Sequence, residues 1–142
     1  MTKSEENSGE LARTYCYTYF RIVGDFDPDA VTALLGIRPD RTRKKGDLRR
    51  NGTKYAESAW ECGRCADYSG DVDCQMRRTI APLTAKIEQL REIRRTCGVS
   101  MFLEVVPTVA PDEPTPCLAP SLAVMQFCCD TGTELDIDLY CV

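Results

Sequence analysis

The 142-residue chain contains no histidine. This absence removes the most common general base, together with every Ser-His or Cys-His nucleophile pair. A zinc site would have to use cysteine thiolates alone. The chain also lacks a usable glycine loop of the kind that binds phosphate groups. Because no set of residues amounts to a catalytic signature, we expect a protein that is not an enzyme and needs no cofactor.

The chain has no apolar run long enough to span a bilayer. Its polar beginning, MTKSEENSGELAR, lacks the hydrophobic middle of a signal peptide. These two absences predict a cytoplasmic protein without membrane contact, in which thiols stay reduced. We expect residues 1–13 to be a disordered leader, and residues 14–142 to form a single α+β domain with its own core.

Basic residues are missing after Arg95, whereas seven acidic residues follow that position. The stretch from Arg38 to Lys54 has the opposite bias, with eight basic residues against two acidic ones. The net charge of −4 argues against a large phosphate-binding footprint, and therefore against a nucleic acid partner. Segregated charge of this kind favours a protein partner, or contact between the two halves of a homodimer.

The stretch from Tyr15 to Ile37 predicts a central strand, a tight turn and a short helix. Side chains alternate from Tyr15 to Val23 and are mostly aromatic or β-branched, which is typical of a strand. Asp27 precedes Pro28 as an N-cap precedes a first-turn proline, and Gly36 is a plausible helix end. Such a helix must bury its apolar stripe against one face of the strand.

The remaining pattern predicts six further elements and a long proline-rich loop. The pattern at residues 38–60 predicts two extended segments joined by an Asn51-Gly52 turn, and the stretch from Cys62 to Asp71 predicts a loop. Helical spacing starts at Met76, and Pro82 predicts a kink. Beyond it we expect a helix at 82–96, a strand at 99–106, a loop at 107–120, a helix at 121–131 and a strand at 134–142.

This order of elements favours a ferredoxin-like fold, which is built on a split βαβ plan. We therefore expect an antiparallel sheet with helices mainly on one face, extended by the C-terminal helix and strand.

The chain resembles the bacterial family known as domain of unknown function 4279. The resemblance rests on short pieces that occur in the family's order and span about nine tenths of the chain. It implies a small α+β domain and carries over no catalytic residues. The matching pieces are YFRIVGDFDPDAVTALLGIRPDRT, KKGD at Lys44 to Asp47, SAW at Ser58 to Trp60, the helix before Cys97, and LDIDLY at Leu135 to Tyr140.

The nine cysteines include one C-x-x-C motif, Cys62-Gly63-Arg64-Cys65. It is open to three interpretations: a redox dithiol, half of a zinc site completed by Cys74 and one further thiol, or ordinary thiols without a shared role. A second C-x-x-C is missing, and the motif does not open a helix after a strand as in thioredoxin-like proteins. The cysteine-dependent functions are therefore the alternative hypothesis, and the motif departs from the family pattern.

Our first hypothesis is a non-enzymatic protein-binding domain, such as an immunity or inhibitor-type protein. If the helices cover the Phe20 side of the first strand, the opposite side carries unassigned aromatic residues that suit a protein partner. Residues of the last strand and of the basic stretch complete the expected surface. Its predicted members are Tyr15, Tyr17, Tyr19, Arg21, Lys44, Lys45, Trp60, Asp136, Asp138 and Tyr140.

Overall fold

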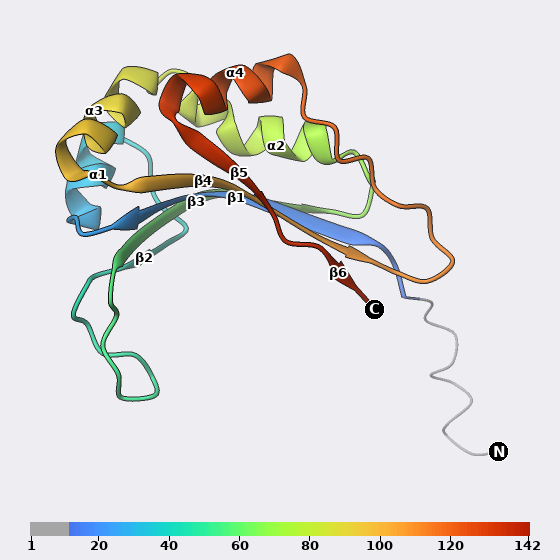
Figure 1. Ribbon diagram of the computed structural model, residues 1–142, viewed down its shortest axis with the longest axis horizontal. Helices are drawn as coiled ribbons and strands as arrows, with labels where there is room; N and C mark the ends of the chain where they lie inside the picture. Colours follow the sequence, from blue (N-terminus) through green and yellow to red (C-terminus); the bar gives the residue numbers. More distant parts are fainter. Residues whose placement is uncertain (1–11) are drawn as a thin grey trace.

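The central strand of the fold is also the first in the chain. In the computed structural model, which describes residues 12–142, β1 (Tyr15–Gly24) lies between β3 (Ser58–Asp67) and β4 (Ser100–Val109) and is antiparallel to both (Figure 1). Residues 1–11 of the predicted leader lie outside the described part. The other elements are α1 (Pro28–Leu35), β2 (Arg41–Arg43), α2 (Val72–Ile80), η1 (Ala81–Leu83), α3 (Ile87–Cys97), α4 (Leu122–Thr131), β5 (Thr133–Ile137) and β6 (Tyr140–Cys141).

The four α-helices of the described residues all lie on one side of the sheet (Figure 1). The residues of β1 that face them, Cys16, Thr18, Phe20 and Ile22, are all buried. Cys16, Phe20 and Ile22 pack into one core with Trp60, Leu103 and apolar side chains of every α-helix. The alternation in the sequence of β1 therefore reports a sheet that is covered on one side.

Local signals set the ends of α1. The side chain of Asp27 accepts a hydrogen bond from the Asp29 N–H, and Pro28 occupies the first helical turn. Gly36 adopts a left-handed conformation with φ 64° and ends the helix. These contacts confirm the helix that the sequence predicts at this position.

The second half of β3 corrects the prediction of a loop from Cys62 to Asp71. The strand continues to Asp67 through a β-bulge, in which two residues of β3 lie opposite the single Tyr19 of β1. Gly63 makes the bulge possible because its φ is 71°, and an added Cβ would lie 2.6 Å from the Thr79 carbonyl oxygen of α2.

Helix α2 binds the polar groups that this bulge frees. The Thr79 hydroxyl donates to the Gly63 carbonyl at 2.7 Å, and the Gln75 side-chain amide donates to the Cys16 and Cys65 carbonyls. Buried backbone groups need such partners. Thus an irregular strand becomes stable once the helix is packed on it.

The sheet has the order β2-β3-β1-β4-β5, with β6 also paired to β4. The predicted sheet was antiparallel throughout, but β5 and β6 run parallel to β4, so the sheet is mixed. Helix α4 supplies the crossover that a parallel neighbour needs. The predicted strand at 134–142 is divided into β5 and β6. The first of them ends at Ile137, because Pro107 of β4 has no N–H to donate to the next residue, Asp138.

The helix that was predicted to kink at Pro82 is instead two separate helices, α2 and α3. Asp71 caps α2, the short η1 contains Pro82, and α3 begins only at Ile87. The fold class is α+β, with a mixed six-stranded sheet. Within residues 12–142, no helix is both long and apolar enough to cross a membrane.

Candidate functional site

The side of the sheet that faces away from the helices, which we call the open face, collects most of the residues predicted for a binding surface. The register places Tyr17 and Tyr19 beside Val106 and Glu104 of β4. Glu104 in turn lies beside Asp136 of β5. The strands thus bring residues more than a hundred positions apart in the sequence onto one surface.

A row of tyrosines runs along the open face. The rings of Tyr68 and Tyr15 are 5.2 Å apart, and the Tyr15–Tyr17 and Tyr17–Tyr19 distances are both 6.1 Å. The guanidinium of Arg64 lies over the Tyr17 ring at 4.1 Å. Aromatic neighbours and a stacked arginine keep the rings of Tyr15, Tyr17 and Tyr19 half-buried, although no helix within residues 12–142 covers them.

Arg21 and Glu104 form an ion pair in the middle of the open face, with a distance of 2.8 Å between Nη2 and Oε1. The Glu104 side chain is only 5% exposed. Burial and the neighbouring Asp136 carboxyl raise the pKa of Glu104 to about 7, although Arg21 acts in the opposite direction. Burial and Glu104 also raise the pKa of Tyr19. The charge of this surface therefore depends on pH near neutrality.

The other predicted members from the C-terminus lie along the same side. Tyr140 is in register with Thr108, which is itself in register with Tyr15. The Tyr140 hydroxyl donates to the Asp138 carboxylate at 2.7 Å, and this hydrogen bond raises the pKa of Tyr140. Asp136, Asp138 and Tyr140 are all exposed. They lie at the edge of the open face, where a partner can reach them.

Three members of the predicted surface lie elsewhere. Trp60 is completely buried on the helix side, where its Nε1 donates to the Thr32 hydroxyl at 3.0 Å, so its assignment to an exposed surface is wrong. Lys44 and Lys45 lie in the segment after β2 and form ion pairs with Asp29 and Asp25, both at 3.0 Å. Their contacts join this segment to the start of α1 and to the turn before it, away from the tyrosine row.

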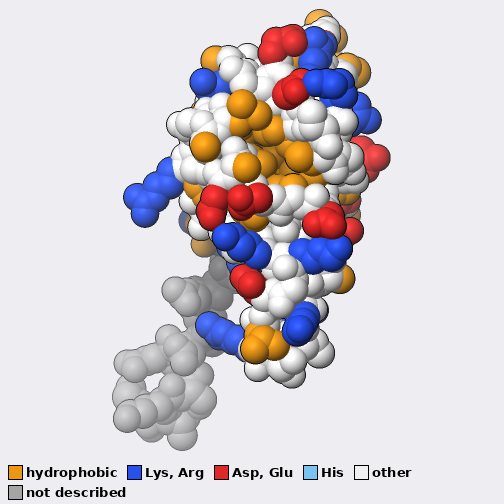
Figure 2. Space-filling model, turned by 90° about the vertical axis from the view of Figure 1, so that its left-hand side faces the viewer, with side chains coloured by type: hydrophobic (Ala, Val, Ile, Leu, Met, Phe, Trp, Pro, Cys, Tyr) orange, Lys and Arg blue, Asp and Glu red, His pale blue; other side chains and the backbone are white. Residues whose placement is uncertain are grey.

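The basic stretch forms a projection below the sheet. A bridge between Leu48 and Lys54 closes its tip, and Leu48 is 70% exposed. Figure 2 shows Lys and Arg side chains on both sides of a hydrophobic group at this lower end of the molecule. Where the projection meets the sheet, a cavity of about 430 Å³ is lined by Arg21, Arg43, Arg49 and Tyr55, among other residues.

The family assignment covers every element of this surface. The model of the family described as domain of unknown function (DUF4279) matches residues 14–142. The chain belongs to this family. No curated protein and no solved structure matched it in the other two comparisons. The DUF4279 match assigns no activity, so the function has to be argued from the geometry.

The cysteines of this DUF4279 protein bear on the metal and redox interpretations. Within residues 12–142, no three cysteine or acidic side chains are placed to hold a metal ion together. Cys62 is buried in β3, and burial raises its pKa to about 12, while the pKa of buried Cys16 rises to about 11. A raised pKa disfavours the thiolate that redox exchange and metal binding require.

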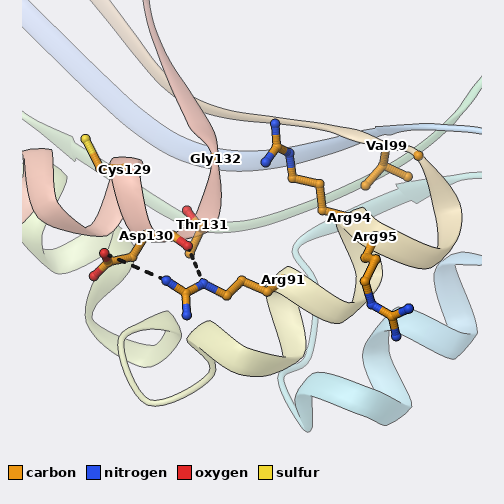
Figure 3. A pocket seen from close by; sticks show the side chains of 9 residues that line it. Arg91, Arg94, Arg95, Val99, Cys129, Asp130, Thr131 and Gly132 are labelled. Carbon is orange, nitrogen blue, oxygen red and sulfur yellow. Dashed lines mark hydrogen bonds and ion pairs between the residues drawn. The ribbon is translucent and has the colours of Figure 1, made fainter.

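A cavity of about 610 Å³ lies between the ends of α3 and α4. Arg91 crosses it to donate to the Asp130 carbonyl at 2.6 Å, whereas Arg95 points away and pairs with Glu92 (Figure 3). Arg94 lies against Gly132, the C-cap of α4. Cations at a helix C-terminus stabilise that helix, so Arg91 and Arg94 of α3 hold the end of α4 against α3.

Glu104 and Arg64 are residues of the open face that the sequence analysis missed. Glu104 is the only charged residue in the apolar run VSMFLEVV, and a lone carboxylate in such a run was a usable signal for a buried ion pair. Arg64 offered no signal, because only the bulge at Gly63 directs it over Tyr17.

Proposed function

We propose that this DUF4279 protein is a non-enzymatic protein-binding domain and that its partner contacts the open face. The observation that carries the proposal is a tyrosine row on a sheet that has helices on one side alone. Tyrosine and arginine are enriched at the centres of protein interfaces, because each combines a large apolar body with polar groups.

The chemistry of the open face supports binding over catalysis. Glu104 has the raised pKa that often accompanies a catalytic carboxyl, yet its side chain is covered and engaged with Arg21. It lines none of the cavities described above. A general acid must reach its substrate within hydrogen-bond distance. The Arg21–Glu104 pair therefore fits a binding surface whose charge changes with pH better than it fits a catalytic site that transfers protons.

Several narrower statements belong to the same proposal. The order β2-β3-β1-β4 and its antiparallel pairings support a split βαβ, ferredoxin-like arrangement for the first part of the sheet. We also propose an immunity or inhibitor role, a bacterial cytoplasmic setting and a homodimer, on the basis of the size of the domain and its segregated charge.

The test is capture of a partner by the tagged full-length chain from lysate of its native host. We expect a stoichiometric partner that is lost when Tyr17 and Tyr19 are both replaced by alanine. The matched control is Tyr55→Ala, which removes a tyrosine from the projection and should leave capture intact. Thermal unfolding shows whether each variant is folded. A partner retained by the folded double variant would contradict the use of the open face, and no stoichiometric partner at all would contradict the proposal.

The alternative function, a cysteine-dependent metal or redox protein, has its own test. Protein purified under reducing conditions should contain no stoichiometric zinc by elemental analysis, and Cys62 should resist alkylation until the chain unfolds. Stoichiometric zinc, or rapid alkylation of both Cys62 and Cys65 in the folded state, would favour the alternative.

A further inference from the structure

The C-terminal edge of the molecule carries most of its exposed apolar side chains. Among residues 12–142, ten large hydrophobic side chains are exposed, and seven of them come after residue 121. Exposed apolar groups that are scattered singly need no explanation, but a concentration of them marks an interaction site. The seven are Leu122, Met125, Leu135, Ile137, Leu139, Tyr140 and Val142.

The two sides of β5 differ in chemistry. Leu135 and Ile137 are in register with the buried Leu103 and Val105, so they point to the helix side of the sheet. They nevertheless remain 37% and 42% exposed, because the helix layer does not cover them fully. Glu134 and Asp136 point to the open face. A neighbouring strand would therefore meet apolar groups on one side and carboxylates on the other.

The backbone of β5 is available for pairing on its outer side. Within the described chain, β5 pairs with β4 alone and forms the edge of the sheet. The Asp138 N–H donates to the Val105 carbonyl of β4, and alternate residues of a strand turn their backbone groups the same way. The N–H and C=O groups of Leu135 and Ile137 accordingly point away from β4. Such an edge is a template for another extended segment.

The charges select which segment can pair there. An antiparallel second copy of β5 would bring the carboxylates of both copies together on the open face, and this repulsion opposes self-pairing. No Lys or Arg follows Arg95 to offset them. The basic β2 of a second copy is a poor fit, since Arg41, Thr42 and Arg43 offer no apolar side chain for Leu135 and Ile137.

We propose that β5 binds an extended segment of a partner protein in which basic and apolar residues alternate, so that the segment continues the sheet beyond β5. Its basic residues lie beside Glu134 and Asp136, and its apolar residues cover Leu135 and Ile137 on the side of α4. This inference rests on the proposed protein-binding function and specifies the chemistry of the partner. Backbone pairing supplies the affinity, and the alternation supplies the specificity.

The first experiment measures fluorescence anisotropy of a labelled nine-residue peptide that alternates Lys and Val, titrated with the full-length chain. We expect binding at least about tenfold tighter than that of a peptide that alternates Glu and Val, because cross-strand pairs of opposite charge stabilise a sheet and like charges destabilise it. Hydrogen exchange should show slower exchange at Leu135 and Ile137 when the Lys peptide is bound. Equal binding of both peptides, or protection elsewhere in the chain, would overturn the inference.

Ile137→Pro tests the backbone contact. Proline removes the outward N–H but no hydrogen bond to β4, so the sheet should persist. We expect peptide binding to weaken at least about tenfold, whereas the matched control Ile137→Thr keeps the N–H and should bind within about threefold of the wild type. Undiminished binding to folded Ile137→Pro would sink the idea. If Ile137→Pro does not fold, the wild-type chain is titrated with a peptide that carries proline at alternate positions. Binding of this peptide as tight as that of the Lys peptide would likewise overturn the inference.

Two further outcomes separate this inference from the proposed function. A native partner captured equally by wild type and Ile137→Pro, but lost with the tyrosine double variant, overturns docking at β5 and leaves the binding function standing. A dimer that light scattering detects in the wild type and that Ile137→Pro abolishes also overturns it, because a second copy then occupies the edge.

Discussion

The two sides of β1 are built from different interactions, although they alternate residue by residue. On the covered side, Phe20 and Ile22 are completely buried beneath the helices. On the open face, Tyr17, Tyr19 and Arg21 stay partly exposed; the two tyrosines stack on each other, and Arg21 pairs with Glu104 of β4. Burial of apolar area stabilises the first side strongly, whereas pairs at a solvated surface each contribute little. Substitutions on the two sides should therefore have different costs.

The largest difference is expected between Phe20→Ala and Tyr19→Ala, which are neighbours in β1. Loss of the buried Phe20 ring, which packs edge-on against Phe127, should lower the free energy of unfolding by about 4 kcal/mol. Tyr19→Ala removes one half-buried ring and should cost about 1 kcal/mol. Urea unfolding of both variants gives the two values. Similar costs would mean that the open face is part of the core, and the contrast between the sides would fail.

The bulge in β3 offers a second contrast, between two glycines with positive φ. Gly63→Ala places a Cβ against the Thr79 carbonyl under α2, and we expect it to cost about 3 kcal/mol from the combined clash and backbone strain. Gly52→Ala, in the projection, meets no atom within 4 Å and should cost about 1 kcal/mol from strain alone. Thermal unfolding measures both. Equal costs would show that close approach of α2 does not constrain Gly63.

The third comparison concerns Glu104→Gln, and its expected effect depends on pH. Folding raises the pKa of Glu104 from the usual 4.5 to about 7. Stability from the protonated carboxyl is therefore fully present below pH 4.5 and is lost as pH rises through about 7. The substituted amide stays neutral, so the variant should gain roughly 2 kcal/mol on the wild type between about pH 5 and pH 8, allowing for screening at the partly exposed Arg21. A constant difference in urea unfolding across this range would contradict the prediction.

The sequence predicted the parts of the fold that depend on local signals. The alternation from Tyr15 to Val23, the Asp27 and Gly36 caps and the apolar run of β4 all correspond to elements of the structure. The loop predicted at Cys62 to Asp71 was wrong because distant partners hold CGRC as a strand, namely β1 and the Thr79 and Gln75 side chains of α2. No periodicity in the segment itself reports such contacts.

The candidate site was predictable to a similar extent. Alternation placed Tyr17 and Tyr19 on one side of their strand and Asp136 on one side of the last strand. The register of the sheet sets these residues on a common face. The sequence favoured a core position for Trp60, because so large a ring is rarely left in water, but it could not remove the residue from the predicted surface. Nor could it show that β5 runs parallel to β4, which depends on the path of α4.

The position of β1 governs when the domain can assemble. This strand is synthesised first, yet its two neighbours come much later in the chain, with Thr18 in register with Cys65 and with Val105. A nascent chain that lacks β4 cannot close the sheet around its first strand. Folding must therefore wait until most of the polypeptide has left the ribosome, and until then the apolar residues of β1 depend on chaperones or on transient contacts to stay out of aggregates.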